Sequence, residues 1–358
     1  MAPPAQEGAF AVALAQLSQP DENAARCARE HHERLTKPPG SLGVLEALGA
    51  QLAAIAGTSP PPLPAPGAIA VFAGDHGVAA GGVTAWPQEV TAQMLANIAG
   101  GGAAINVLAR AASASVTVID VGVATGPAAI PGVVGRRVRA GTANLADGPA
   151  MTTSDARRAL DVGAEVAADL VAQGAGALVT GDMGIANTTP AAALVAAFTG
   201  RPCATVTGRG TGVDDAMLAT KVALVERAVA RLPRDADPLA VLATVGGLEH
   251  AAIAGFIVGG AAAGVPVVVD GVIALSGLLA AAALAPRSVG FCIAGHRSPE
   301  PGASAALDHL GLRPVLDLGM RLGEGTGACL ALPVIEAAAR ILREMATFDA
   351  AGVAQLPR

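Results

Sequence analysis

Two acidic residues lie in glycine-rich segments of the sequence, where a carboxylate seldom has a structural role. Glu324 lies in the run Leu-Gly-Glu-Gly-Thr-Gly-Ala over 322–328, and Asp182 lies in Gly-Asp-Met-Gly over 181–184. A glutamate between glycines supports no helix and covers no apolar stripe, so a solvated loop acid explains it less well than usual. A partly desolvated carboxylate among backbone N–H groups suits a general base. We therefore expect Glu324 to accept a proton, and Asp182 to bind a ribose hydroxyl or to stabilise a developing cation.

Glycine-rich turns supply a second kind of chemistry, because free backbone N–H groups at the start of a helix bind phosphate. The best such segment is Gly208-Arg209-Gly210-Thr211-Gly212, which precedes a helical stretch containing Lys221, and Gly-Gly-Gly at 100–102 is another. Tight packing of strands against helices in a glycine-rich protein explains either loop about equally well. Neither loop matches the P-loop pattern or a G-x-G-x-x-G after the first strand. A P-loop ATPase and an NAD enzyme are therefore disfavoured.

Histidines follow two of the predicted strands, at Asp75-His76 and in the segment His-Arg-Ser-Pro-Glu over 296–300. A histidine at such a place is more often a structural hydrogen-bond partner than a ligand. The two are far apart in sequence, without a cysteine or carboxylate at metal-binding spacing, so we predict no metal site. The chain also has no G-x-S-x-G and no assignable Cys/His nucleophile pair.

The apolar pattern after residue 66 predicts the strands and helices that position these residues. Short β-branched runs alternate with alanine-rich helical stretches, which is the pattern of an α/β protein with a mainly parallel, doubly wound sheet. The expected strands are Ala68–Ala73, Ser115–Asp120, Ala177–Thr180, Ala204–Thr207, Ala240–Thr244, Val265–Asp270 and Val289–Ala294. Ligands bind outside the carboxyl ends of such strands, and most of the glycine-rich and polar segments follow them directly. Their accumulation at one edge favours a small polar, phosphorylated ligand.

Helical patterns with charged faces cover Phe10–Leu17, Glu22–Leu35 and Leu42–Ile55, before a proline-rich segment at 59–66. A further helix is expected over Leu332–Met345, with a proline at 333 in its first turn. We predict a smaller helical subdomain built from the two chain ends, residues 1–60 and 330–358, beside an α/β domain over 61–329.

Composition excludes several classes of protein. The chain has 358 residues, a net charge of −6, 52% hydrophobic residues and only 2% aromatic residues. It lacks both the basic surface and the stacking platforms of nucleic-acid binders, and its apolar content argues against disorder. Four separated cysteines and a start without a signal-peptide pattern lead us to expect a cytoplasmic protein.

A mean hydropathy of +0.52 raises the question of a membrane protein. The uncharged runs 183–200 and 251–269 have the length to span a bilayer. They are rich in Ala and Gly, however, and include Pro, Asn and Thr, whereas a spanning helix needs about 20 strongly apolar residues. We therefore expect no membrane partner.

The motifs, taken in order, resemble a known family. They are Thr-Lys-Pro-Pro-Gly-Ser-Leu-Gly at 36–43, Ala-Gly-Asp-His-Gly-Val at 73–78, the segments 181–189 and 208–212, Val-Asp-Gly at 269–271, His-Arg-Ser-Pro-Glu-Pro-Gly at 296–302, and 322–328. Together they resemble the nicotinate-nucleotide:dimethylbenzimidazole phosphoribosyltransferases, which prepare the lower ligand of cobalamin. The resemblance extends from about residue 20 to about residue 350 and includes several independent motifs in register.

The resemblance implies a reaction. The 5-phosphoribosyl group passes from nicotinate mononucleotide to a nitrogen of 5,6-dimethylbenzimidazole or a related base, with inversion at the anomeric carbon. The products are nicotinate and α-ribazole 5′-phosphate. The resemblance also implies Glu324 as the base that accepts the benzimidazole proton, no metal or organic cofactor, and a homodimer.

Further site residues follow from the same resemblance. Asp182 stands where the family usually has glutamate, near the ribose. Around the ribose phosphate it implies Gly184, Gly208, Arg209, Gly210, Lys221, Asp270 and Gly271. The base pocket would be lined from the segment 86–94, including Trp86 and Met94, and from Met183. The only tryptophan of the chain, Trp86, replaces a small residue such as serine, and alanine replaces a histidine at 303.

Two alternatives remain at this stage. One is a catalytically silent protein that binds a phosphorylated ligand on the same scaffold, which would not need Glu324. The other is a phosphoribosyltransferase for a different base, because Trp86 either covers the pocket or reshapes it.

Overall fold

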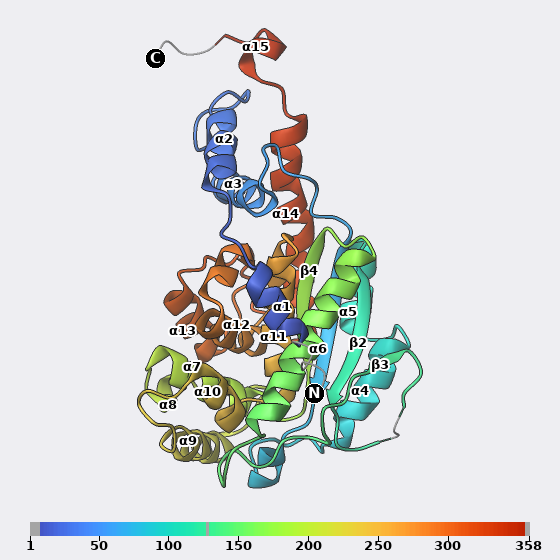
Figure 1. The fold of residues 1–358 in the computed structure, drawn as a ribbon, viewed down its shortest axis with the longest axis vertical. Coiled ribbons are helices and arrows are strands. Elements are labelled where there is room, and N and C mark those ends of the chain that lie inside the picture. The colour runs from blue at the N-terminus through green and yellow to red at the C-terminus, as the bar shows by residue number, and fades with distance from the viewer. Residues whose placement is uncertain (1–7, 127–128, 355–358) are drawn as a thin grey trace, which may run out of the picture.

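The computed structural model describes residues 8–126 and 129–354 (Figure 1). In chain order, its elements are α1 (Ala9–Gln16), α2 (Glu22–His32), α3 (Val44–Ala56), β1 (Gly67–Gly74), η1 (Gly77–Gly81), α4 (Glu89–Ala99), α5 (Ala104–Ala111), β2 (Ser115–Gly122), β3 (Val133–Gly135), α6 (Thr153–Ala172), β4 (Ala177–Met183) and α7 (Thr188–Thr199). There follow α8 (Cys203–Val206), α9 (Asp215–Val229), α10 (Pro238–Val245), α11 (Leu248–Ala262), β5 (Val267–Val269), α12 (Val272–Leu284), η2 (Pro286–Phe291), β6 (Cys292–Ala294), α13 (Pro301–Leu310), α14 (Thr326–Glu344) and α15 (Phe348–Ala351).

The six strands form one parallel sheet in the order β3-β2-β1-β4-β5-β6. Every residue of β1 is buried, as expected for a strand with helices on both faces. The order along the sheet reverses between β1 and β4, so the chain leaves these neighbouring strands toward opposite sides. This is the switch point at which doubly wound sheets form a crevice beyond the carboxyl ends of their strands.

Two apolar layers enclose the sheet, which confirms the doubly wound α/β prediction. The residues of β1 alternate between them: Phe72 packs in the layer formed with α6, α7, α11 and α12, whereas Val71 packs in the layer formed with α3, α4, α5 and α14. Because successive side chains of a strand point to opposite faces, each β1 residue joins one layer or the other.

Helices α6 and α11 approach each other closely through glycine. A Cβ at Gly163 of α6 would lie 1.8 Å from the carbonyl oxygen of Ala252, and one at Gly255 of α11 would lie 1.9 Å from the carbonyl oxygen of Leu160. No side chain fits at either position, so the abundant Gly and Ala of this chain serve backbone-to-backbone packing.

Two predicted strands are wrong. Ala204–Thr207 falls on the helical turn α8, and Ala240–Thr244 lies inside helix α10. A short apolar run does not distinguish a buried strand from a buried helix. Proline provides the missing signal, since Pro202 is the N-cap of α8 and Pro238 is the first residue of α10.

Other boundaries also differ from the predictions. The edge strand β3 was not predicted, and the final strand begins only at Cys292, after the 3-10 turn η2. Helix α14 begins six residues earlier than expected, so Pro333 stands inside the helix rather than in its first turn. It begins there because Gly325 adopts a left-handed conformation and ends the preceding loop.

Helices α2 and α3 and the far part of α14 project from the body of the molecule, with α15 beyond them (Figure 1). A β-bridge between Leu35 and Thr347 joins the two chain ends there. Helix α1, in contrast, packs on α6 and α11. We propose that residues 1–60 and 330–358 form the helical subdomain, with α1 as its anchor on the α/β domain.

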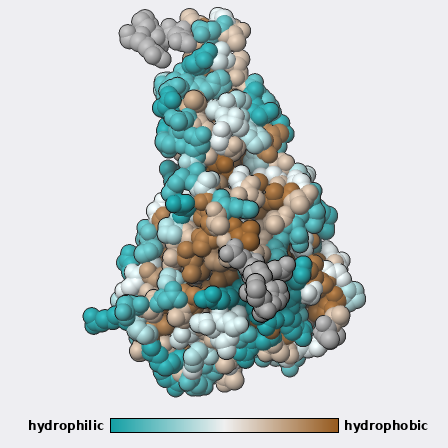
Figure 2. Space-filling view, in the orientation of Figure 1, coloured by the Kyte–Doolittle hydropathy of each residue, from teal (hydrophilic) through white to brown (hydrophobic). Residues whose placement is uncertain are grey.

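One segment, Glu89–Ala111, has the length and apolar composition of a membrane span, and 33% of its most apolar window is buried. In the structure this segment is two helices, α4 and α5, separated at Gly100–Ala103. Their 11 and 8 residues are each too short to cross a bilayer. Figure 2 shows hydrophobic residues gathered around α1 in the middle of the face drawn, whereas the projecting helices are mainly hydrophilic.

Candidate active site

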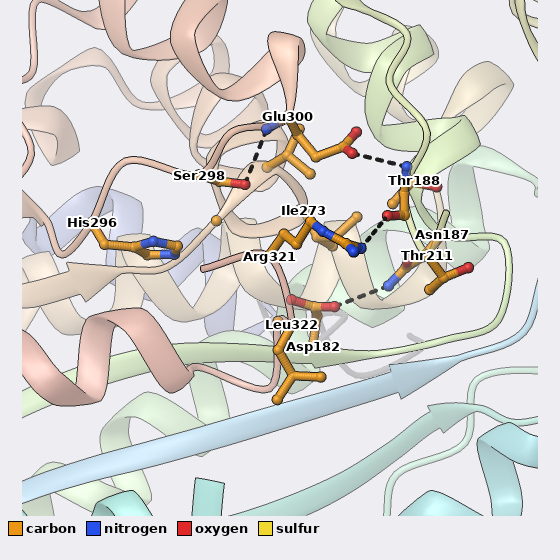
Figure 3. Close-up of a pocket in the computed structure, with 14 residues that line it drawn as sticks. Asp182, Asn187, Thr188, Thr211, Ile273, His296, Ser298, Glu300, Arg321 and Leu322 are labelled. Carbon is orange, nitrogen blue, oxygen red and sulfur yellow. Dashed lines mark hydrogen bonds between the residues drawn. The ribbon is translucent and has the colours of Figure 1, made fainter. Parts of the chain in front are cut away.

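A pocket opens beyond the carboxyl ends of the central strands and encloses about 480 Å³, part of it open to solvent. Its walls come from segments far apart in sequence: the end of β4, the start of α7, the loop before α9, the start of α12, the segment after β6 and the loop before α14 (Figure 3). The predicted residues Asp182, Gly210 and Gly271 are among those that line it. The pocket therefore lies at the edge where sequence analysis expected a ligand.

Asp182 is held near the end of β4 and is only 6% exposed. Its Oδ2 accepts a hydrogen bond from the Asn187 side-chain amide at 3.0 Å (Figure 3). Burial and the neighbouring carboxylate of Asp270 raise the pKa of Asp182 well above its usual range. In the free protein this carboxyl group is therefore poised to hold a proton.

Glu324 is brought beside Asp182 by the glycine-rich loop. Its backbone N–H donates to the Asp182 carbonyl oxygen at 3.3 Å, and its side-chain Oε2 accepts from the Ile105 N–H at 3.3 Å. The φ of Glu324 is +60°, a left-handed conformation that is uncommon outside glycine and asparagine. Burial raises the pKa of its carboxyl group. A strained backbone that holds a buried carboxyl group of raised basicity is a typical feature of functional sites.

Asp270 completes a group of three buried acids. It follows β5, and its Oδ1 accepts from the Ala328 N–H at 2.9 Å and lies 3.3 Å from His296 Nε2. Its backbone N–H donates to the Thr180 hydroxyl at 3.1 Å. Asp270 therefore ties β4, β5 and the start of α14 together beneath the pocket, and it adds negative charge near Asp182.

Lys221 is buried although its own helix, α9, lies toward the periphery. Its Nζ donates to the Thr188 hydroxyl at 2.7 Å and to the Gly208 carbonyl oxygen at 2.9 Å. Burial lowers the pKa of Lys221 to about 8, and the carboxylate of Glu300 opposes this change. The ammonium group thus reaches the junction between the start of α7 and the glycine-rich loop 208–212.

The loop 208–212 is fixed by a carboxylate from another segment. Glu300 Oε1 accepts from the Gly210 N–H at 2.8 Å, and a Cβ at Gly208 would lie 1.9 Å from Glu300 Oε2. The glycine at 208 is therefore required by close approach of this carboxylate. The side chain of Arg209 forms an ion pair with Asp215 and is about half exposed.

Several pocket residues were not selected from the sequence. Arg321, Asn187, Thr211 and Ser298 line the pocket, and Arg321 Nη1 donates to the Gly210 carbonyl oxygen at 3.1 Å (Figure 3). Thr211 is next to Gly210 and Arg321 stands two residues before Gly323, whereas Asn187 and Ser298 each stand three residues after a glycine, in segments that follow predicted strands. Of these residues, only Arg321 brings a cationic side chain into the pocket.

The remaining residues predicted for the ribose phosphate and for the base are less closely grouped. Gly184 and Arg209 line a smaller adjoining pocket that shares Asn187, Thr188 and Thr211 with the first. Met183 is half-buried against an apolar cluster that also includes Met94 of α4. Trp86 does not line either pocket and is 52% exposed, although its backbone N–H donates to the hydroxyl of Thr84, which lines the smaller one.

Comparison with known proteins identifies a common family. A family model described as phosphoribosyltransferase matches residues 17–353. A nicotinate-nucleotide–dimethylbenzimidazole phosphoribosyltransferase of Salinispora tropica is 57% identical over 350 residues, covering 94% of this chain and 96% of the relative. One from Chloroflexus aggregans is 53% identical over 336 residues, covering 94% and 95%. The crystal structure of the enzyme of that name from Thermus thermophilus has a TM-score of 0.90 at 50% identity, covering 94% of this chain and all of that one.

Proposed function

The chain belongs to the phosphoribosyltransferase family of these relatives, and we propose how the residues described above perform that family's reaction. The enzyme transfers the phosphoribosyl group of nicotinate mononucleotide to 5,6-dimethylbenzimidazole. The observation that best supports a catalytic assignment is the position of Glu324 next to Asp182, whose side chain lines the strand-end pocket, with Lys221 bonded to Thr188 in the wall of the same pocket.

The transfer requires one proton acceptor. The bond between the ribose anomeric carbon and the pyridinium nitrogen breaks, and its electron pair remains on that nitrogen, which leaves as nicotinate without protonation. A nitrogen lone pair of the benzimidazole forms the new bond to the anomeric carbon, and the N–H proton of the base passes to the carboxylate of Glu324. Burial raises the basicity of this carboxylate, which favours the proton transfer.

Asp182 faces the same crevice, and we assign it to the ribose. As a carboxylate it accepts a hydrogen bond from a ribose hydroxyl and stabilises positive charge developing on the sugar ring. The positive pyridinium ring of bound nicotinate mononucleotide opposes the raised pKa of Asp182 and favours its ionised form. Asp270 keeps the local field negative from beneath the pocket.

We assign the phosphate to the opposite wall of the site. Lys221 supplies positive charge beside Thr188, at the N-terminus of α7, where backbone N–H groups also favour an anion. The loop 208–212 with Gly208, Gly210 and Arg209, together with Gly184 and Gly271, surrounds this region. A bound phosphate raises the pKa of Lys221 again, so binding and protonation reinforce each other.

We infer that the base enters from the side of the segment 84–94, where Trp86, Met94 and Met183 supply apolar surface. Trp86 is half exposed, and the family resemblance implies a small residue at this position in relatives. Relative kcat/KM values for benzimidazole, dimethylbenzimidazole, a phenolic base and adenine should change when Trp86→Ser is compared with the parent enzyme. Unchanged ratios would exclude Trp86 as a determinant of base preference.

We further propose that the protein is cytoplasmic, as its composition suggested, and that it forms a homodimer, which the family resemblance implies. Light scattering coupled to size-exclusion chromatography tests the oligomer directly, and a mass of about 35 kDa, that of one chain, would exclude it.

The decisive assay for the function is release of nicotinate from nicotinate mononucleotide, measured with and without dimethylbenzimidazole. We expect release to depend on the base and to match formation of α-ribazole 5′-phosphate in a one-to-one ratio. Base-independent release would show hydrolysis instead of transfer. Binding of nicotinate mononucleotide without turnover would indicate a silent ligand-binding protein.

A further inference from the structure

A second group of titratable side chains is buried behind the active site. His76 follows β1, and Glu249 and His250 stand in the first turn of α11. Glu249 Oε1 lies 2.8 Å from His76 Nε2 and 2.7 Å from His250 Nδ1, and all three side chains are fully buried. The three ligand atoms lie within 4.8 Å of one another. Neither the base, the ribose nor the phosphate assignment uses these residues.

The short distances alone fit a carboxylate that accepts hydrogen bonds from two imidazole rings. The orientations of the side chains do not fit such hydrogen bonds. Within the described residues, neither oxygen of Glu249 and none of the ring nitrogens of His76 and His250 makes an aligned hydrogen bond. Buried polar atoms are seldom left without partners, and this group leaves six of them. Two imidazole nitrogens and a carboxylate oxygen that converge in this way can also serve as ligands of one ion.

Glycines let the backbone approach these atoms closely. A Cβ at Gly247 would lie 2.6 Å from Glu249 Oε2 and 2.7 Å from His250 Nδ1, and one at Gly74 would lie 2.8 Å from Glu249 Oε2. Any side chain at either position would displace the cluster. The backbone on two sides is thus shaped around these polar groups.

The charge of the surroundings also favours a cation. Asp75, which precedes His76, is a further fully buried carboxylate, and its Oδ1 has no hydrogen-bond partner among the described residues. If both imidazoles were neutral, the buried carboxylate of Glu249 would have no compensating positive charge within the cluster, whereas a divalent ion would supply it.

We propose that His76, Glu249 and His250 bind one divalent transition-metal ion of the zinc class. Two imidazole nitrogens and a carboxylate oxygen are typical ligands of Zn²⁺ and of Co²⁺, whereas Mg²⁺ and Ca²⁺ prefer oxygen alone. The second oxygen of Glu249 is available as a further donor. The ion joins the segment after β1 to the start of α11.

This ion has a structural role. The transfer reaction described above needs no metal, and Glu324 and Lys221 are not ligands of this site. A Cβ at Gly184 would lie 3.4 Å from His76 Nε2, so the cluster sits directly behind the backbone at the end of β4. An ion that holds His76 in place therefore also supports the segment at the end of β4 that carries Asp182 and Gly184.

The test measures metal content. Because the site is buried, the protein should be produced in medium supplemented with Zn²⁺ or, separately, with Co²⁺, so that metal is present while the chain folds. We expect about one equivalent per chain after exhaustive dialysis, measured by plasma mass spectrometry, and less than roughly a tenth of an equivalent in Glu249→Gln and His250→Leu. His32→Leu is the matched control, since His32 is also buried without an aligned partner and lies in α2. It should retain the metal.

The cobalt form provides a readout that does not depend on any variant folding. Visible absorption bands of Co²⁺ with nitrogen and oxygen ligands should appear in the wild-type protein. Folded, active wild-type protein with less than roughly a tenth of an equivalent of either metal would overturn the proposal. Metal retained by both ligand variants would place it elsewhere and equally overturn it. Transfer activity is measured on the same samples, so failure of the metal site remains distinct from failure of the proposed function.

Discussion

Replacing Glu324 by glutamine removes its basicity while keeping its size. The side-chain amide oxygen can still accept the hydrogen bond that Ile105 N–H donates at 3.3 Å, and the flanking glycines at 323 and 325 still permit the left-handed loop. A hydrogen bond of this kind contributes about 1 kcal/mol to stability, and glutamine preserves it. We therefore expect a folded protein whose free energy of unfolding changes by less than about 1 kcal/mol.

Catalysis should respond much more strongly. General-base catalysis contributes about 10²- to 10⁴-fold, which corresponds to about 3–5 kcal/mol of transition-state stabilisation. We expect kcat for nicotinate release in the presence of dimethylbenzimidazole to fall by this factor. The Kd for nicotinate mononucleotide should stay within about threefold, because Glu324 does not bind the phosphate.

The assay follows nicotinate by chromatography in single-turnover and steady-state modes, with binding measured by calorimetry. Glu344→Gln is the matched control, since Glu344 is an exposed acid on α14 that pairs with Arg340, and its activity should equal that of the parent enzyme. A loss of less than about tenfold in Glu324→Gln, with intact nucleotide binding, would refute the assignment of Glu324 as the base.

Further predictions concern pH, phosphate binding and packing. The kcat/KM for nicotinate mononucleotide should fall at acid pH, starting above the usual range of a glutamate, because the base must be ionised and burial raises the pKa of Glu324. It should also fall above pH about 8 as the buried Lys221 loses its proton, and a profile that is flat on the alkaline side would contradict this role. Lys221→Met should raise KM for nicotinate mononucleotide by about tenfold or more with a smaller effect on kcat, in initial-rate measurements; an unchanged KM would remove Lys221 from the phosphate site. Gly163→Ala should destabilise the protein by about 3 kcal/mol in denaturant unfolding, because its Cβ would overlap the Ala252 carbonyl oxygen. Gly148→Ala, where a Cβ meets nothing within 4 Å, is the control, and equal stability of the two variants would contradict the packing argument.

The parallel sheet could be predicted because each of its strands is encoded by a short, continuous segment of the sequence. A buried strand such as β1 is a continuous apolar run followed by a glycine, and this pattern is visible without any tertiary information. The failures occurred where local patterns are ambiguous. The runs at 204–207 and 240–244 contain β-branched residues, yet the first falls on a helical turn and the second lies inside a helix, and a proline precedes each of them.

The active site was predicted in part for a similar reason. Glu324 and Asp182 are conspicuous because each stands among glycines, and the family resemblance assigned the lysine at 221. Arg321 was missed because its position in the pocket depends on the course of a loop. Its guanidinium reaches the Gly210 carbonyl oxygen across 111 residues of sequence, which no local pattern encodes.

The sequence by itself determined the class of fold, and it predicted a ligand at one edge of the sheet and one carboxylate as the base. These follow from residue types and short-range spacing, which set strand, turn and loop. Only the tertiary structure decided which distant groups meet. His76 lies far in sequence from Glu249 and His250, so spacing indicated no metal, yet packing of α11 behind β1 places their ligand atoms within 4.8 Å. The physical reason is that side-chain clusters depend on the packing of whole elements, whereas a sequence pattern reports only on neighbours along the chain.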